Sequence, residues 1–443
     1  MTLKINSDEL SKQTRGRNFR YAVASSMASK ITTVAVQIIA IPLAALSLGA
    51  HEFALYAMLM AAVGWLTLSN LGIGPTLVVK LAAAHVHGSI SEEGQIFSSA
   101  FFPALLISAV VSLSAMFALW VLPVGSIFGQ LYINDLPTIR MGLTVLICIF
   151  FFQTNISLFE SAQAGYQRQY IANILAAVSS LPCILAIYII SKINPTPVDI
   201  ILALNIPVII FKFGNVVWIM WRSPHIIPSL VNFRWDICKG LVKNGMIFSL
   251  AGGFGNFLAH ILPVIIIGRR FASDISASFS ATMNVIILVS GVIAMLATPL
   301  WPAISESVAR GDRDWGKRAY RRLLWSIMTF GFFVALFLGV GGEWLFSIWF
   351  KGEIIPSQRL LLAAGFYFVA LCWESAHFSI LIGLHKIKVA SILMCIRSIV
   401  GVVATIVFIP IGNEAIPFVA MFISILIVNL IPLRKLVIRG LFN

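Results

Sequence analysis

The feature that most restricts the fold of this chain is its division into about twelve apolar runs, each close to 20 residues long. A helix needs about 20 mostly apolar residues to cross the hydrocarbon core of a membrane. With 59% hydrophobic and 11% charged residues among 443, the chain has more apolar surface than one water-soluble core can enclose. We therefore predict an all-α integral membrane protein. The predicted spans are residues 21–48, 53–81, 96–122, 139–164, 170–191, 198–221, 245–268, 276–305, 323–342, 359–384, 389–409 and 415–433.

The basic residues indicate how these spans are oriented. Of the 31 Lys and Arg residues, 22 lie on or beside the segments on the same side as the N-terminus, and 6 lie on or beside the opposite loops. The positive-inside rule then predicts that both termini are cytoplasmic. The basic tail and the loop 310–322 are orientation signals first, and contact with anionic lipid is a second interpretation. This distribution accounts for the net charge of +14 without nucleic acid as a partner.

The cysteines and histidines do not indicate a metal or cofactor site. The five cysteines lie in or beside spans and show no CxxC spacing, so we expect neither a disulfide nor a bound metal. His85 and His87 form only a short pair in an expected cytoplasmic loop. We also expect no cofactor. The first apolar run is too long for a signal-peptide core, and we expect it to be retained.

An internal duplication divides the chain into two related halves. The segment 165–175 (GYQRQYIANIL) matches 383–393 (GLHKIKVASIL), and both are expected in cytoplasmic turns after the fourth and tenth spans. A weaker similarity links the sequences around Gly88 and Gly311. The alternative is that two turns with a glycine and a base match by chance. Six spans repeated in parallel orientation predict two pseudo-symmetric bundles that rock against each other. The predicted divisions are a basic tail 1–20, an N-terminal lobe 21–221, a linker 222–244, a C-terminal lobe 245–433 and a tail 434–443.

Three basic residues, Lys30, Lys212 and Arg397, lie deep inside apolar runs. A cation at the middle of a membrane costs at least about 2.5 kcal/mol, so such groups normally face a partner, a cavity or a substrate. We predict that they line a positively charged lumen. Lys30 and Lys212 could instead extend toward the headgroups, and Arg397 could be neutralised by Glu374, which lies at matching depth in the preceding span.

Polar residues at helical spacing predict which faces turn away from lipid, because lipid cannot satisfy their hydrogen bonds. The first span carries Thr33 and Gln37 on the face of Lys30, and the sixth carries Asn215 on the face of Lys212. The predicted substrate-binding residues are Lys30, Lys212, Arg397, Thr33, Gln37, Asn215 and Asn256.

Titratable residues inside the spans are candidates for binding a coupling ion. These are Glu374, Glu160, His260 and His377. Each also has a structural interpretation, as an ion-pair partner, a helix-end carboxylate or a polar wall. Equivalent spans of the two halves carry Gly- and Pro-rich sequences, which we interpret either as hinges or as ordinary kinks. The hinge candidates are Gly72, Gly74, Pro75, Pro299 and Pro302.

The chain resembles the multidrug/oligosaccharidyl-lipid/polysaccharide (MOP) exporter superfamily, and within it the Wzx-type O-antigen and polysaccharide flippases. The resemblance is carried by residues 26–30, by LSLGAHEFALYAM leading to LSNLGIGPTLVVKLAAAHVHG, and by GLHKIKVASIL. It extends over nearly the whole chain, although each motif is diffuse.

The resemblance implies a V-shaped, two-lobed bundle in the bacterial inner membrane. Its substrate would be an oligosaccharide linked to undecaprenyl pyrophosphate, moved from the cytoplasmic to the periplasmic leaflet with H⁺ or Na⁺ as coupling ion. Membrane lipids and a polysaccharide polymerase would be its partners. Fixed cations suit this cargo, because a pyrophosphate is anionic and charges attract strongly in a low-dielectric cavity.

Three alternatives remain at the level of the sequence. Cation-coupled drug exporters of the MATE type have the same architecture, but they typically carry an acid in the first span, where this chain has Lys30. Peptidoglycan-precursor flippases usually carry two further spans. Membrane polysaccharide polymerases and ligases are enzymes with large periplasmic loops, whereas the outer loops here are short and carry no paired carboxylates at catalytic spacing. We therefore predict a transporter and not an enzyme.

Overall fold

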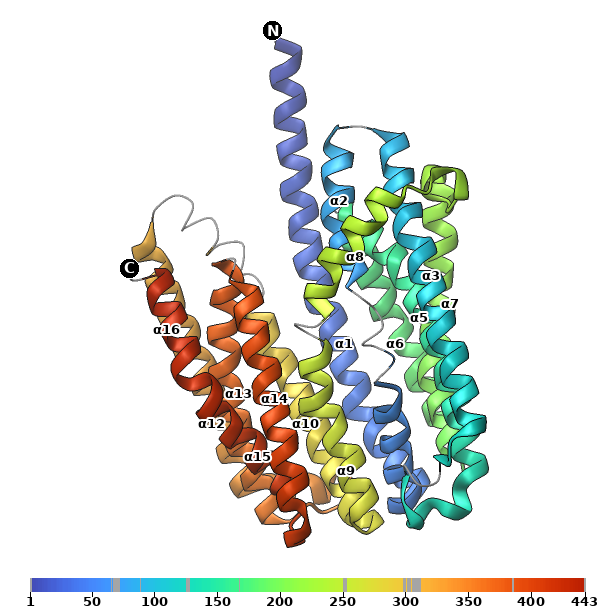
Figure 1. The fold of residues 1–443 in the computed structure, drawn as a ribbon, viewed down its shortest axis with the longest axis vertical. Helices are drawn as coiled ribbons and strands as arrows, with labels where there is room; N and C mark the ends of the chain where they lie inside the picture. Colours follow the sequence, from blue (N-terminus) through green and yellow to red (C-terminus); the bar gives the residue numbers. More distant parts are fainter. Residues whose placement is uncertain are drawn as a thin grey trace. The chain divides into compact units, whose positions relative to one another are not determined.

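The computed structural model consists of helices and connecting turns throughout the part of the chain that it describes (Figure 1). The described residues are 2–64, 66, 72–87, 89–124, 128–166, 168–249, 253–297, 300, 304, 312–384 and 386–441. Within these ranges the side chains of residues 2–28, 30, 79, 83, 86–87, 244, 247–248, 295 and 387 are not described.

The chain forms two compact units. Unit 1 comprises Met1–Leu43, Leu66–Leu122 and Met141–Ser249, and unit 2 comprises Ala44–Trp65, Pro123–Arg140 and Leu250–Asn443. The long helix α1 (Thr2–Val63) contributes to both. The other helices that lie mainly in unit 1 are α2 (Ile73–His87), α3 (Ile90–Val121), α5 (Leu136–Gly165), α6 (Gln169–Ile190), α7 (Pro197–Arg222), η3 (Pro224–Ile226), η4 (Leu230–Asn232) and α8 (Trp235–Ser249). Those of unit 2 are η2 (Gln130–Asp135), η6 (Phe257–Ile261), α9 (Leu262–Arg270), α10 (Ser273–Ala297), α12 (Arg313–Trp349), α13 (Gln358–Gly383), α14 (Ile387–Phe408), η7 (Ile409–Ile411), α15 (Ile416–Ser424), η8 (Ile425–Asn429) and α16 (Leu430–Leu441).

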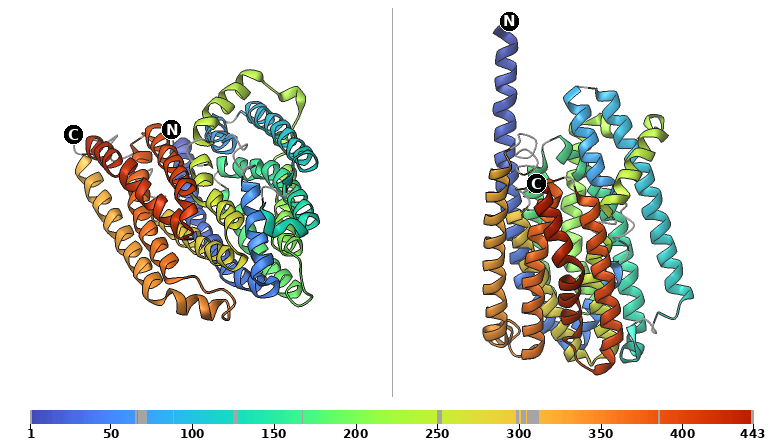
Figure 2. Two further views of the ribbon diagram at one scale, coloured as in Figure 1. Left: turned by 60° about the horizontal axis from the view of Figure 1, so that its bottom comes forward. Right: turned by 60° about the vertical axis from the view of Figure 1, so that its left-hand side comes forward.

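The predicted all-α membrane architecture is confirmed. Within the described residues, ten helical stretches are long and apolar enough to cross a membrane. Two predicted spans are less regular than expected. The span 53–81 is interrupted between the end of α1 at Val63 and the start of α2 at Ile73, and the span 245–268 is divided among α8, the π-helix η6 and α9. In unit 2, α12 and α13 run side by side along their length, as both views in Figure 2 show.

Local sequence sets several helix ends. At the start of α7, Thr196 accepts a hydrogen bond from the Asp199 backbone N–H while the Asp199 carboxylate accepts one from Thr196, which is a capping box. Ser357 caps α13 through Leu360 N–H at 3.2 Å. At the first predicted outer loop, α1 bends at Gly49, whose φ of +72° is a conformation that glycine adopts without strain.

The two turns of the predicted duplication have the same local geometry. α5 ends at Gly165 and α13 ends at Gly383, and the next helices are capped by Arg168 and Lys386 with similar backbone angles. The backbone N–H of each cap residue donates to the carbonyl five residues earlier, at 2.8 Å and 2.9 Å. This agreement supports a structural repeat over a chance match of turn residues.

The segment 222–244 packs firmly against unit 1. Ile226 and Leu241 are fully buried in the core of that unit, and Arg234 N–H donates to Ser99 Oγ at 2.8 Å. The helices η3, η4 and α8 of this segment contact α3, and α8 also contacts α2.

Candidate functional site

The polar face predicted on the sixth span, α7, meets polar residues of α5 inside unit 1. Three pairs connect α5 to α7, and we call them the α5–α7 ladder: Gln153–Asn205, Glu160–Lys212 and Gln163–Asn215. The partners of every pair are 52 residues apart, as expected for two helices that run in the same direction with α6 between them. The spacings of seven and three along each helix keep the pairs on one seam.

Lys212 and Glu160 form the ion pair of the ladder. The Lys212 ammonium lies 3.1 Å from Glu160 Oε1 and 3.2 Å from Oε2. Each side chain keeps 24% of its surface exposed within a membrane-spanning helix. Lys212 is therefore neutralised but still reachable, and a second anion can compete with Glu160 for it.

Asn215 and Gln163 form the amide pair one turn further along the ladder. Each amide donates to the other's oxygen, at 3.0 Å and 2.7 Å, and the Asn215 side chain is only 2% exposed overall. Such interhelical pairs typically stabilise membrane bundles by about 0.6–2 kcal/mol. Asn215, predicted to bind substrate, therefore holds α5 and α7 together.

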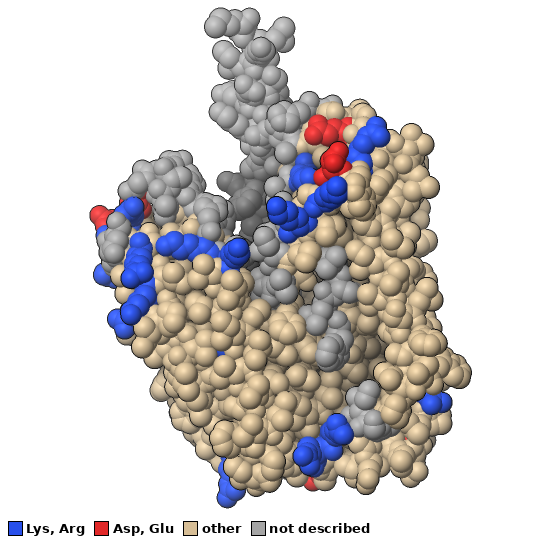
Figure 3. Space-filling view, in the orientation of Figure 1, with Lys and Arg blue, Asp and Glu red and all other residues tan. Residues whose placement is uncertain are grey.

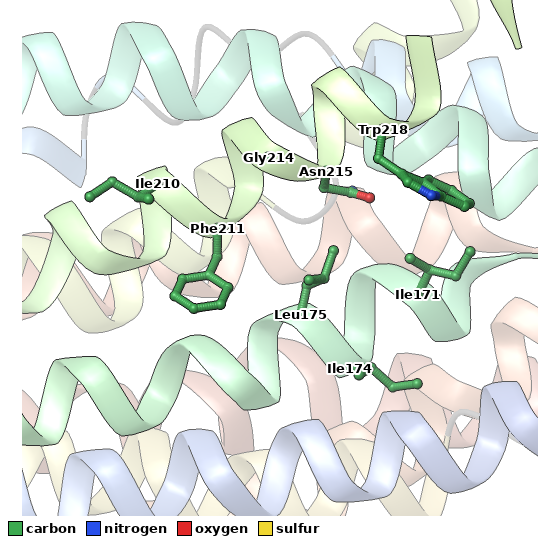
Figure 4. Close-up of a pocket in the computed structure, with 8 residues that line it drawn as sticks. All are labelled: Ile171, Ile174, Leu175, Ile210, Phe211, Gly214, Asn215 and Trp218. Carbon is green, nitrogen blue, oxygen red and sulfur yellow. The ribbon is translucent and has the colours of Figure 1, made fainter. Parts of the chain in front are cut away.

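A pocket of about 480 Å³ opens between α6 and α7 next to this pair (Figure 4). Its lining is apolar apart from the Asn215 amide and the Trp218 indole. The lining residues are Ile171, Ile174, Leu175, Ile210, Phe211, Gly214, Asn215 and Trp218. Gly214 leaves space at the pocket, because a Cβ placed there would meet nothing within 4 Å. Since α6 and α7 are both candidate spans, the pocket can accept a lipid chain.

The remaining predicted polar contacts lie on two helical segments. Thr33 is exposed, and its hydroxyl donates to the Ser29 carbonyl at 2.8 Å, whereas Gln37 is half-buried. Asn256 is exposed in unit 2. The Lys30 side chain lies outside the described residues, but Lys30 belongs to the same compact unit as Lys212.

Arg397 is enclosed in unit 2 instead of lining an open surface. Its Nε donates to Glu374 Oε1 at 3.0 Å, and its Nη2 lies 2.9 Å from Glu374 Oε2. The two side chains are only 2% and 0% exposed. Asn429, at the end of the π-helix η8, donates a further hydrogen bond to Glu374. The geometry favours the second interpretation of the sequence, in which Glu374 neutralises Arg397.

The two histidine candidates also contribute to unit 2. His377 is fully buried, with Nδ1 2.8 Å from the Trp373 carbonyl and Nε2 2.9 Å from the Tyr320 hydroxyl. His260 lies in the π-helix η6, with Nε2 3.1 Å from the hydroxyl of Tyr367. Both ring nitrogens of His377 are satisfied within the bundle, whereas His260 Nδ1 is buried and has no hydrogen-bond partner among the described residues.

The hinge candidates are described only in the first half of the chain. Gly72, with φ of +59°, precedes α2, while Gly74 and Pro75 lie in its first turn. A Cβ on Gly74 would lie 2.8 Å from Ser161 Oγ, so α2 packs closely on α5 at this point. Pro299 and Pro302 lie outside the described residues.

Sequence reasoning missed a cluster centred on Glu93 in unit 1. The Glu93 carboxylate is 4% exposed and lies 3.0 Å from His85 Nδ1 and 2.8 Å from His225 Nε2. It also accepts a hydrogen bond from the Tyr166 hydroxyl at 2.9 Å. Burial and the neighbouring carboxylate raise the pKa of Tyr166, so this hydroxyl stays protonated as a donor. The cluster joins α2, α3, η3 and the turn after α5, and only the pairing of His85 with an acid eight residues later hinted at it.

A second missed cluster lies in unit 2, at the bend of α1. His51 Nε2 is 2.8 Å from Asp135 Oδ2, and His51 Nδ1 is 2.9 Å from Ser273 Oγ. The imidazole stacks on Tyr132 at 4.9 Å. Three segments far apart in the sequence are joined here, which no periodicity within one span could reveal.

Comparison with known proteins identifies what the chain is similar to. The family model described as polysaccharide biosynthesis protein matches residues 21–308. A Salmonella typhi protein named "Putative O-antigen transporter" is 21% identical over 385 residues, which is 85% of this chain and 86% of that protein.

Two solved structures share the fold. An inward-facing multidrug resistance MATE transporter of the MOP superfamily aligns with a TM-score of 0.75 at 13% identity, covering 94% of this chain and 98% of its own. The lipid II flippase MurJ in an inward closed conformation aligns with a TM-score of 0.69 at 12% identity, covering 94% and 88%. At such identities the similarity defines the fold alone.

Proposed function

This chain belongs to the polysaccharide biosynthesis protein family, and we propose that it moves an oligosaccharide linked to undecaprenyl pyrophosphate from the cytoplasmic to the periplasmic leaflet of the bacterial inner membrane. The chain has the MOP fold and is a transporter, not an enzyme. The proposal depends above all on one observation: Lys212 lies in a membrane span, paired with Glu160, while a quarter of each side chain stays exposed.

Lys212 is the residue that we assign to the pyrophosphate. A phosphate carries more negative charge than a carboxylate and offers more acceptor oxygens, so it can displace Glu160 from the ammonium. Glu160 returns to Lys212 after the substrate leaves and keeps the cation neutral in the empty transporter. The Lys212–Glu160 pair is thus an exchangeable site, whereas a fixed pair would offer the substrate nothing.

The lipid tail and the sugar need different surroundings. The apolar pocket between α6 and α7 is lined by α7 residues from Ile210 to Trp218 and so spans the level of Lys212, which lets a chain attached to the phosphate enter it. Sugar hydroxyls would meet polar side chains that remain accessible. Thr33, Gln37 and Asn256 are exposed or half-buried and fit this role.

Glu160 is the candidate that we favour for the coupling ion. When phosphate takes Lys212, the freed carboxylate needs a cation of its own in the low-dielectric membrane, which H⁺ or Na⁺ supplies. Glu374 and His377 are fully buried with partners in place, and His260 already contacts Tyr367.

We propose the lobes 21–221 and 245–433 as the rocking halves, both termini as cytoplasmic, and a polysaccharide polymerase as the partner that takes up the product.

The first experiment measures surface polysaccharide in a strain that depends on this chain for export. Lys30→Ala and Lys212→Ala should each abolish export while the amount of protein in the membrane is unchanged. Lys192→Ala is the matched control, because Lys192 follows the end of α6 at Ile190 and its ammonium lies over the Tyr188 ring, at 5.3 Å. Normal export by both Lys30→Ala and Lys212→Ala would refute the proposal.

The same strain separates lipid-linked glycan transport from drug export. Efflux of a cationic dye should not depend on this chain, because Lys212 occupies the Glu160 carboxylate in the empty transporter and leaves no free acid there for a dye. Dye efflux that disappears with the gene and survives in Lys212→Ala would favour the drug-exporter alternative.

A further inference from the structure

A second charged pocket lies in unit 2, between the end of α10 and the start of α12, and the proposed transport function does not use it. Its volume is about 290 Å³. The lining combines two guanidinium groups, a hydroxyl and an indole with aliphatic side chains. The residues are Leu296, Leu300, Trp315, Arg318, Ala319, Arg322, Leu323 and Ser326.

The two arginines lie on one face of α12, and Asp314, one turn before Arg318, is the acid that interacts with Arg318 electrostatically. Arg318 and Arg322 are four residues apart, so their side chains are neighbours on the helix and repel each other. Both are exposed, and within the described residues neither forms a salt bridge. The nearby Asp314 carboxylate instead accepts a hydrogen bond from Lys317 at 3.0 Å. The pocket therefore presents two fixed positive charges that an external anion could neutralise.

The position of the pocket along α12 corresponds to the headgroup region of a membrane. α12 has 37 residues, whereas about 20 suffice to cross the hydrocarbon core. The apolar stretch of this helix starts at Leu323, so Arg322 and Arg318 precede it by one and five residues. Trp315 lies two turns before that boundary, in the interfacial zone where Trp is enriched. Figure 3 shows Lys and Arg gathered at the end of unit 2 that carries the C-terminus.

We propose that this pocket binds the phosphate of an anionic membrane phospholipid. Arg318 and Arg322 would hold the phosphate oxygens, since a guanidinium matches phosphate with paired hydrogen bonds. Ser326, one turn deeper, would donate to the glycerol ester region. The first methylenes of an acyl chain would lie on Leu296 and Leu323. Basic pockets between membrane helices on the cytoplasmic side bind acidic headgroups in this manner, and the proposed orientation places this one in the cytoplasmic leaflet.

The proposal differs from the orientation signal that the same residues provide. Positive-inside orientation depends on the number of basic residues near a span and treats neighbouring arginines alike. A pocket distinguishes them, because Arg318 and Arg322 line it whereas Arg313 and Arg321 on the same helix do not. This difference supplies a control with an equal loss of charge.

The test is native mass spectrometry of the purified full-length chain with added phosphatidylglycerol or phosphatidylcholine. The wild type should retain phosphatidylglycerol preferentially. Arg318→Gln with Arg322→Gln should lower that retention by at least about tenfold relative to Arg313→Gln with Arg321→Gln. Ser326→Phe fills the pocket without changing charge and should cause a similar loss, which separates the site from general effects of the arginine substitutions.

Several results would overturn the proposal. One is equal loss in the two double variants, which would indicate a diffuse basic surface. Another is equal retention of phosphatidylcholine and phosphatidylglycerol. Full displacement of the lipid by inorganic pyrophosphate would assign the arginines to a soluble phosphate instead. The assay contains no lipid-linked glycan, so its failure would leave the proposed transport function unaffected.

Discussion

The two units each contain a cation inside a membrane span, but they enclose it differently. In unit 1, Lys212 and Glu160 connect α5 to α7, and each keeps 24% of its side-chain surface exposed. In unit 2, Arg397 and Glu374 connect α13 to α14 and are 2% and 0% exposed. The sequence placed both cations at similar depth, yet one pair is enclosed and the other is partly exposed. Exposure, not depth, therefore distinguishes the two pairs.

The residues around each pair explain the difference. Glu374 receives hydrogen bonds from both Arg397 and Asn429, so its charge is matched within unit 2. A buried pair of this kind is costly to break, because removing one partner leaves an uncompensated charge out of water. Glu160 has only Lys212 as an ionic partner among the described residues, and the two side chains each keep 24% of their surface exposed.

The largest expected effect concerns the buried Arg397–Glu374 pair. Arg397→Met should destabilise the protein by about 3–5 kcal/mol, because Glu374 remains buried without its cation. Lys212→Met should cost less than Arg397→Met, because Glu160 keeps 24% of its side-chain surface exposed and can take up H⁺ or Na⁺ when its cation is removed. Thermal unfolding of the detergent-solubilised protein and its steady-state amount in the membrane measure both. Adding Glu374→Leu to Arg397→Met should recover part of the loss, and equal destabilisation by the two single variants would remove the distinction.

The next effect concerns the buried Glu93 carboxylate, which lies near the start of α3 in unit 1 and not at the middle of a span. Glu93→Gln should lower the free energy of unfolding by about 2–3 kcal/mol, because the charge-assisted hydrogen bonds from His85, His225 and Tyr166 weaken. Glu92→Gln is the matched control, since that neighbouring side chain is exposed. Chemical or thermal unfolding measures the difference. Similar stability of the two variants would show that the Glu93 cluster does not stabilise unit 1.

Exchanging the two charges of the Lys212–Glu160 pair tests whether the position of its cation matters. Lys212→Glu combined with Glu160→Lys preserves the ion pair but moves the cation from α7 to α5. Stability should remain within about 1 kcal/mol of the wild type. Polysaccharide export should fall by about tenfold or more, because the phosphate loses a contact worth at least about 1.4 kcal/mol. Export at the wild-type level would show that the Lys212–Glu160 pair is structural after all.

The smallest effect concerns the apolar pocket between α6 and α7. Gly214→Leu places a side chain in the space between α6 and α7, and we expect export to fall by about threefold with little change in unfolding temperature. Gly291→Leu is the control in unit 2, because a Cβ there also meets nothing within 4 Å. Export assays alongside thermal unfolding distinguish a blocked pocket from a damaged fold. Unchanged export in Gly214→Leu would exclude the pocket from the path of the lipid chain.

Much of the fold could be predicted from the sequence because lipid imposes a simple rule on it. Ten described helical stretches match the length and hydropathy of spans, and the duplicated turns at Gly165 and Gly383 proved to share one geometry. Predictions failed where helices lack a regular apolar run. The break before α2 and the π-helix η6 depend on neighbouring helices, and hydropathy contains no information about those neighbours.

The candidate site was predicted less completely. Helical periodicity identified the faces with Glu160 and Asn215, because a polar stripe in a span must be turned away from lipid. It did not predict that Gln163 would satisfy Asn215, nor that Glu93 would gather two histidines and a tyrosine from other helices. Periodicity describes one helix at a time, whereas a hydrogen-bonded pair requires the rotation and register of two.

The sequence by itself determined that this chain is a helical membrane protein in two related halves, with basic residues inside its spans. The energy of placing charges and polar groups in lipid is local to each helix, so composition and spacing reveal it. Only the tertiary structure decided which acid meets which cation, and how much of each pair stays exposed. The constant offset of 52 residues along the α5–α7 ladder and the closure of Glu374 around Arg397 both arise from packing between helices, which no single helix encodes.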